Sequence, residues 1–93
     1  MKPAPFIYVM QRGFVLVGRM AEEQFDSLTI SLNDVAIIAN WGTTQGLGEL
    51  AVKGPLAQTR LHPEPDGTEI SRMAIYRKIP CDQKAWSEYG AKD

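Results

Sequence analysis

The chain has 93 residues, of which 44% are hydrophobic and 23% charged, so it is too apolar for a disordered tail. Its length suits one domain, residues 1–93, with a single modest core. The near balance of ten basic and eleven acidic residues argues against a DNA or RNA polymer as the partner, and no apolar run is long enough to cross a membrane.

The first apolar runs, Phe6–Arg12 and Phe14–Met20, predict a tight β-hairpin that turns at Gly13. The turn is so short that Arg12 and Phe14 are expected to join it. Both strands are apolar on both faces, and so small a chain can hardly cover both faces alone. We therefore expect a homo-oligomer, a dimer or a tetramer, joined through this hairpin.

The next segments predict two further strands. Ser27–Leu32 alternates between polar and apolar residues, with Leu28, Ile30 and Leu32 expected to point inward. Asn33-Asp34 predicts a turn or a bulge, after which Val35–Trp41 resumes as a strand.

The stretch Asn40–Pro55 changes from strand to glycine-rich loop to short helix. The helical part is indicated by three residues whose i, i+3, i+4 spacing places them on one face: Leu47, Leu50 and Ala51. Gly54-Pro55 is a stop signal, because glycine accepts the left-handed conformation after a helix and proline cannot continue one.

The remainder is turn-rich from Gly54 to Gly67, and Thr68–Ile79 then predicts one long strand that ends at Pro80. Asp82 is suited to cap a short C-terminal helix that carries Trp86. We therefore expect an α+β fold: a small, strongly bent antiparallel sheet of about five strands, one central short helix and a short C-terminal helix.

Trp41 and Gly42 are the first candidate binding residues. A tryptophan at a strand end can stack on a nucleobase, and a neighbouring glycine lets the base approach. The alternative is that Trp41 belongs to the core, and the sequence favours neither interpretation.

Thr43, Thr44 and Gln45 precede the predicted helix, where hydroxyl and free amide groups can hold an anion. Plain N-capping by Thr43 or Thr44 explains the same residues without a ligand and is the commoner arrangement. Their spacing matches no phosphate-binding loop.

Several basic residues fall on predicted strands or turns: Arg12, Arg19, Arg72, Arg77 and Lys78. An arginine on a strand with two apolar faces needs a carboxylate, a phosphate or an exposed edge. Cys81 and His62 have no catalytic or metal-binding partner in the sequence. We therefore expect no enzymatic activity, no metal and no cofactor.

The order of short motifs resembles a family of small phage-encoded proteins of unknown function. The resemblance covers about Tyr8 to Trp86 and rests on these segments: Arg12–Gly18, Asn40–Gly42, Leu47–Ala51, Gly54 and Arg77–Cys81. It implies a protein that acts in the cytoplasm of an infected bacterial host.

Small phage proteins without catalytic residues include oligomeric sponges, which sequester cyclic nucleotide signals of defence systems such as CBASS or Thoeris. By this resemblance, the chain would bind a cyclic di- or oligonucleotide at a subunit interface. Trp41 would stack on a base, Thr43, Thr44 and the loop amides would hold phosphate, and Arg12 or Arg77 would supply charge. The alternatives are a phage protein that inhibits a host protein through an exposed apolar sheet and, less favoured, a nucleotide hydrolase.

Overall fold

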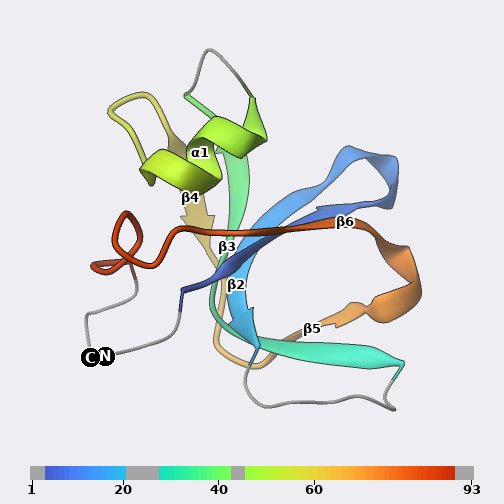
Figure 1. Cartoon of the computed structure of the whole chain (residues 1–93). Helices are drawn as coiled ribbons and strands as arrows, with labels where there is room; N and C mark the ends of the chain where they lie inside the picture. Colours follow the sequence, from blue (N-terminus) through green and yellow to red (C-terminus); the bar gives the residue numbers. More distant parts are fainter. Residues whose placement is uncertain (1–3, 21–27, 43–45, 90–93) are drawn as a thin grey trace.

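The computed structural model describes residues 4–20, 28–42 and 46–89, which form a bent antiparallel sheet with one α-helix (Figure 1). The strands are β1 (Phe6–Met10), β2 (Val15–Met20), β3 (Thr29–Asn40), β4 (Arg60–Pro63), β5 (Thr68–Ser71) and β6 (Ile75–Pro80). The helix α1 spans Leu47–Lys53, and short 3-10 turns occur at Gln11–Gly13 and Arg72–Ala74. No helix in these ranges is long and apolar enough to cross a membrane.

The strands lie in the order β4-β3-β2-β1-β6, and β5 also pairs with β3. The long strand β3 has β2 on one edge, whereas its other edge pairs with β5 near its start and with β4 near its end. The predicted hairpin is confirmed as β1 and β2, with Arg12 in its turn. The prediction of a small, bent antiparallel sheet with a central helix is likewise confirmed.

The middle of β3 contains the predicted irregularity. Asp34 has a φ of 50°, and the register with β2 shifts between Val17 and Arg19. The alternative of a bulge is therefore confirmed, and the two segments predicted on either side of it form one continuous strand. A bulge increases the local twist and bends the strand, so β3 can contribute side chains to the cores on both faces of the sheet.

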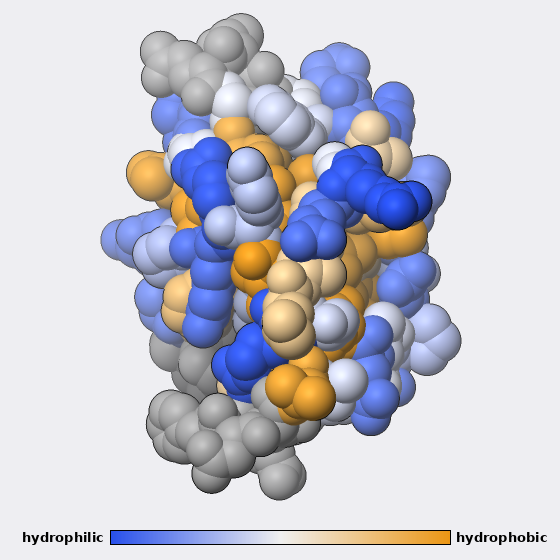
Figure 2. Space-filling model, turned by 90° about the vertical axis from the view of Figure 1, so that its right-hand side faces the viewer, coloured by the Kyte–Doolittle hydropathy of each residue, from blue (hydrophilic) through white to orange (hydrophobic). Residues whose placement is uncertain are grey.

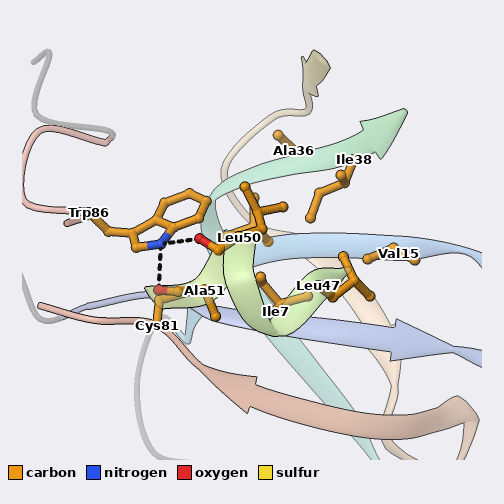
Figure 3. Close-up of a cluster of buried hydrophobic side chains, with 10 residues drawn as sticks. Ile7, Val15, Ala36, Ile38, Leu47, Leu50, Ala51, Cys81 and Trp86 are labelled. Carbon is orange, nitrogen blue, oxygen red and sulfur yellow. Dashed lines mark hydrogen bonds between the residues drawn. The ribbon is translucent and has the colours of Figure 1, made fainter. Parts of the chain in front are cut away.

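One face of the sheet forms the helix-side core, which is covered by α1 and the C-terminal segment (Figure 3). Its buried members are Ile7, Val15, Val17, Ala36, Ile38, Leu47, Leu50, Ala51, Cys81 and Trp86. The indole Nε1–H of Trp86 donates to the carbonyl oxygens of Leu50 at 3.2 Å and Ala51 at 3.0 Å. Trp86 thus fills the core and also satisfies carbonyls at the end of α1.

The other face forms the opposite core, which is enclosed where β3 and β5 curl over β1 and β2. Its buried members are Tyr8, Leu16, Ile30, Leu32, Val35 and Ile70. One chain therefore covers both faces of the hairpin. Two apolar faces therefore do not by themselves require a second copy, because the bend of the sheet covers them, and the homo-oligomer stays a prediction.

Three local predictions need correction. Leu28, expected to point inward, is 71% exposed because it precedes the first paired residue of β3. The strand predicted from Thr68 to Ile79 is interrupted at Arg72–Ala74, because β5 pairs with β3 whereas β6 pairs with β1. The chain must turn there to pass from one partner to the other.

The C-terminal segment forms consecutive turns at residues 83–89 instead of the predicted short helix. The Asp82 carboxylate does accept the Ala85 N–H at 2.8 Å, as a helix cap would. So short a segment has little helical stability of its own. Its position is fixed instead by the side chain of Trp86, which is anchored to α1.

Candidate functional site

The structure places Trp41 at the surface, just after β3 and outside both cores. Its side chain is 41% exposed, and the fully buried indole is that of Trp86. The adjoining backbone is fixed because the Thr59 hydroxyl donates to the Trp41 carbonyl at 2.7 Å. Trp41 is thus accessible, as a stacking role requires, although no bound base is needed to explain its position.

Gly42 is required by the backbone at this point. Its φ is 71°, and a Cβ atom would lie 2.3 Å from the Thr59 nitrogen. The glycine therefore permits contact between two chain segments, and its role in admitting a base remains a prediction.

Thr43, Thr44 and Gln45 lie outside the described residues. The structure nevertheless corrects the capping prediction, because Gly46 occupies the N-cap of α1. The helix begins too late for Thr43 or Thr44 to be its N-cap. With only seven residues, α1 offers weak support for an anion site.

A hollow of about 450 Å³ lies beside the β1–β2 turn. It is lined by Val9, Met10, Gln11, Arg12, Gly13 and Tyr76. The turn is closed by the Met10 N–H, which donates to the Phe14 carbonyl at 2.7 Å, and Arg12 takes a φ of 68° within it. The β1–β2 turn and β6 therefore present an arginine and an exposed tyrosine, Arg12 and Tyr76, to the same hollow.

Arg77 lies close to this hollow along the sheet. It is exposed on β6 and is paired in register with Val9, one of the lining residues. Two of the predicted site residues, Arg12 and Arg77, therefore lie at the same end of the β1–β6 pair. Trp41 and Gly42 do not line the hollow.

Tyr76 is the main residue that sequence reasoning missed. Its side chain is 78% exposed. A signal was present: Tyr76, Arg77 and Lys78 are consecutive side chains suited to solvent exposure and precede a proline. Such a run is typical of a strand at the edge of a sheet.

Arg19 is occupied inside the protein. Its guanidinium is buried and forms a 3.0 Å ion pair with the carboxylate of Asp34. It also lies 5.5 Å from the ring centre of Tyr89, whose hydroxyl donates to the Asp34 carbonyl at 2.6 Å. Such an arginine was expected to need a carboxylate, a phosphate or an exposed edge, and the structure confirms the carboxylate.

The remaining reactive groups show no catalytic arrangement. Cys81 is buried, and burial raises the pKa of its thiol to about 12, so the thiol stays protonated at neutral pH. His62 is exposed on β4. Within the described ranges, no three His, Cys, Asp or Glu side chains are grouped as metal ligands would be.

Tyr8 has a buried hydroxyl with no hydrogen-bond partner in the described part of the chain. Burial is the main cause that raises the pKa of this phenol, and Arg72 partly offsets it. The group lies in the opposite core and does not line the hollow.

No protein-family model matches the chain, and no curated protein or solved structure shows significant similarity to it.

Proposed function

We propose that this is a non-enzymatic interaction protein that docks on another protein through one exposed face, the docking face. Following the sequence resemblance, it is a phage protein that inhibits a host protein in the cytoplasm of an infected bacterium. The docking face is defined by Leu28, Met73, Tyr76 and the hollow beside the β1–β2 turn.

The observation that carries this proposal is the exposure of large apolar side chains on that face. Leu28 is 71% exposed, Met73 77% and Tyr76 78%. The Arg72 N–H donates to the Leu28 carbonyl at 2.8 Å, which brings the start of β3 beside the turn that carries Met73. Figure 2, which views the side of the β1–β2 turn, shows apolar side chains flanked by hydrophilic ones. Grouped apolar side chains with a polar border are typical of protein-binding surfaces.

The test begins with capture of bacterial host proteins on the immobilised wild-type chain. Any captured protein is then purified, and its affinity is measured for the wild type and for Met73→Ser/Tyr76→Ser. Loss of central apolar contacts is expected to weaken binding at least about tenfold.

Val52→Ser is the matched control, because Val52 is also exposed but lies on α1, away from the docking face. Circular dichroism and thermal melting show whether each variant stays folded. The proposal fails if both changes weaken binding equally, or if neither does.

Sequestration of a cyclic di- or oligonucleotide is the second candidate function. It is favoured by Arg12 and Tyr76, which line one hollow of a size found in ligand sites. Tyr76 would stack on a base, and Arg12 with Arg77 would hold phosphate. Trp41 and the segment Thr43–Gln45 would belong to a separate contact or to the neighbouring subunit of an oligomer.

A thermal-shift screen against cyclic nucleotides, followed by chromatography of the recovered ligand, tests this second function. Intact ligand after a clear shift supports sequestration, whereas altered ligand indicates a hydrolase. Absence of any shift leaves the protein partner as the supported function. Light scattering on the same samples measures whether the chain forms the expected dimer or tetramer.

A further inference from the structure

The strand β6 occupies an edge of the sheet. It pairs with β1 and, within the described residues, with no other strand. Tyr76, Arg77 and Lys78 are all exposed, although neighbouring residues of a strand point to opposite faces. Exposure on both faces is the pattern expected of an edge strand, whereas a central strand buries at least one face.

The alternation of hydrogen-bonded and non-hydrogen-bonded residue pairs between β1 and β6 shows which backbone groups of β6 point away from β1. The Cys81 N–H donates to the Pro5 carbonyl at 3.2 Å, which marks these residues as a hydrogen-bonded antiparallel pair. Such pairs alternate with non-hydrogen-bonded pairs. In the register of β1 and β6, Arg77 and Ile79 therefore direct their N–H and C=O groups to β1. Lys78, opposite Tyr8, directs its own N–H and C=O groups outward. The alternation ends at Arg77, because the register shifts between the pairs Val9–Arg77 and Met10–Ile75 and leaves Tyr76 without a paired residue in β1.

The charge at this edge favours a partner of opposite sign. Arg77 and Lys78 are exposed on opposite faces of β6, and Arg12 lines the hollow near its start. The Lys78 ammonium lies 4.3 Å from the ring centre of Phe6, so its stem covers the sheet while its charge stays at the edge. In the described part of the chain, the ion pairs found join other residues.

These charges disfavour a second copy of the chain as the occupant. If two β6 strands paired around a twofold axis, their basic side chains would be brought together, and like charges across paired strands are destabilising. In some proteins, basic residues on an edge strand have no role other than to prevent such pairing. Here, however, the exposed Tyr76 and the adjoining hollow supply apolar contacts that a purely blunted edge lacks.

We propose that β6 binds an extended acidic segment of a partner protein, which adds to the sheet as a further strand. The proposal rests on the proposed protein-docking function and specifies the chemistry of the partner. The N–H and C=O groups of Lys78 pair with the added strand, and its acidic side chains meet Arg12, Arg77 and Lys78. An apolar side chain of the segment enters the hollow beside Tyr76. Main-chain pairing supplies affinity and the hollow supplies specificity in this mode of recognition.

The probe is a fluorescent peptide that alternates glutamate with valine and contains one phenylalanine. Binding is measured by anisotropy on the full chain. A peptide with lysine in place of glutamate tests charge, and a peptide with prolines at alternate positions tests main-chain pairing. We expect each of these two peptides to bind at least about tenfold more weakly than the acidic peptide.

Arg77→Glu/Lys78→Glu is expected to weaken binding of the acidic peptide at least about tenfold. Lys84→Glu/Lys53→Glu makes the same change in net charge away from β6 and is expected to have less than about a twofold effect. Amide hydrogen exchange, followed by NMR, gives the second measurement. The bound peptide is expected to slow exchange at Lys78 but to change little at Arg77 and Ile79, which already bond to β1.

Three results would overturn the proposal: no binding of the acidic peptide at millimolar concentration, equal binding of all three peptides, or unchanged exchange at Lys78. Protection of the Lys78 amide in the free protein together with a dimer mass would also overturn it, because a second copy would then fill the edge. If the peptide fails while Met73→Ser/Tyr76→Ser still weakens a captured partner, the docking function stands and strand addition falls.

Discussion

The guanidinium of Arg19 and the carboxylate of Asp34 form a 3.0 Å ion pair at the point where β3 bends. Arg19 comes from the central strand β2, and Asp34 takes a left-handed backbone conformation with a φ of 50°. The pair therefore joins the bulge to the strand beside it. The hydroxyl of Tyr89 adds a hydrogen bond to the Asp34 carbonyl, so the C-terminal segment is tied to the same bend.

Asp34→Asn is expected to lower the free energy of unfolding by about 3–5 kcal/mol, because it leaves the buried guanidinium without its charged partner. Asparagine accepts positive φ, so the backbone is not a confounding factor. Urea unfolding measures the loss. Lys53→Gln is the control, because it breaks the Lys53–Glu49 pair on α1 at the lysine, whose side chain is 61% exposed, and is expected to cost less than about 1 kcal/mol. Equal losses would contradict the structural role of Arg19 and Asp34.

Ionisation of Tyr89 is expected to lower the stability of the protein at alkaline pH. Burial, with a smaller contribution from the Asp34 charge, raises the pKa of this phenol from 10.0 to about 12. The unfolded chain therefore releases the phenol proton at lower pH than the folded chain. This contribution to stability is complete below pH 10 and is lost as the pH rises towards about 12.

The variant Tyr89→Phe keeps the ring and removes the ionisable hydroxyl. Its free energy of unfolding is expected to fall less steeply between pH 10 and 12 than that of the wild type. At neutral pH it is expected to be less stable by about 1 kcal/mol, because the hydrogen bond to Asp34 is lost. Parallel slopes above pH 10 would show that another group causes the alkaline loss.

Cys81 is expected to be protected from thiol reagents in the folded state. Its thiol is buried, and burial raises its pKa to about 12. Reaction with a chromogenic disulfide at mildly alkaline pH is expected to be at least about tenfold slower than in denaturant. A rate equal to that of the denatured chain would place Cys81 at the surface.

Much of the local structure could be predicted because its determinants are close in sequence. The period of Leu47, Leu50 and Ala51 and the glycine at 54 define α1, and Gly13 between two apolar runs defines the hairpin. The need of Arg19 for a carboxylate, a phosphate or an exposed edge followed from its position on an apolar strand. The partner itself, Asp34, is selected by the register of β2 and β3, which no local pattern contains.

The parts that could not be predicted depend on which strands pair with each other and on which distant segments bury each face of the sheet. Thr68–Ile79 has the composition of one strand, and its interruption follows from the different pairing partners of β5 and β6. The two faces of the hairpin are covered by Trp86 on one side and by the curl of β3 on the other. The exposure of Tyr76 likewise depends on β6 lying at an edge of the sheet.

The two tryptophans are expected to respond differently to substitution. Trp86→Ala is expected to lose about 3–5 kcal/mol of stability, because it opens a cavity beside Leu50 in the helix-side core. Trp41→Ala is expected to lose less, since that indole lies at the surface. With Trp41→Phe, the remaining Trp86 fluorescence is expected to resist acrylamide quenching. The assignments are wrong if Trp41→Ala destabilises the protein as much as Trp86→Ala does.

The glycines allow a matched series that separates backbone strain from steric contact. Gly42→Ala is expected to be the most destabilising change, because its φ is 71° and its new methyl group would meet the Thr59 backbone at 2.3 Å. Gly13 has a φ of 85° but open space where the methyl group of Gly13→Ala would lie, so only backbone strain of about 1–2 kcal/mol is expected. Gly48→Ala lies within α1 with no atom nearby and is expected to stabilise the protein by up to about 1 kcal/mol. Urea unfolding of the three variants gives the order directly, and a Gly42→Ala variant as stable as Gly13→Ala would mean that the 42–59 contact yields without cost.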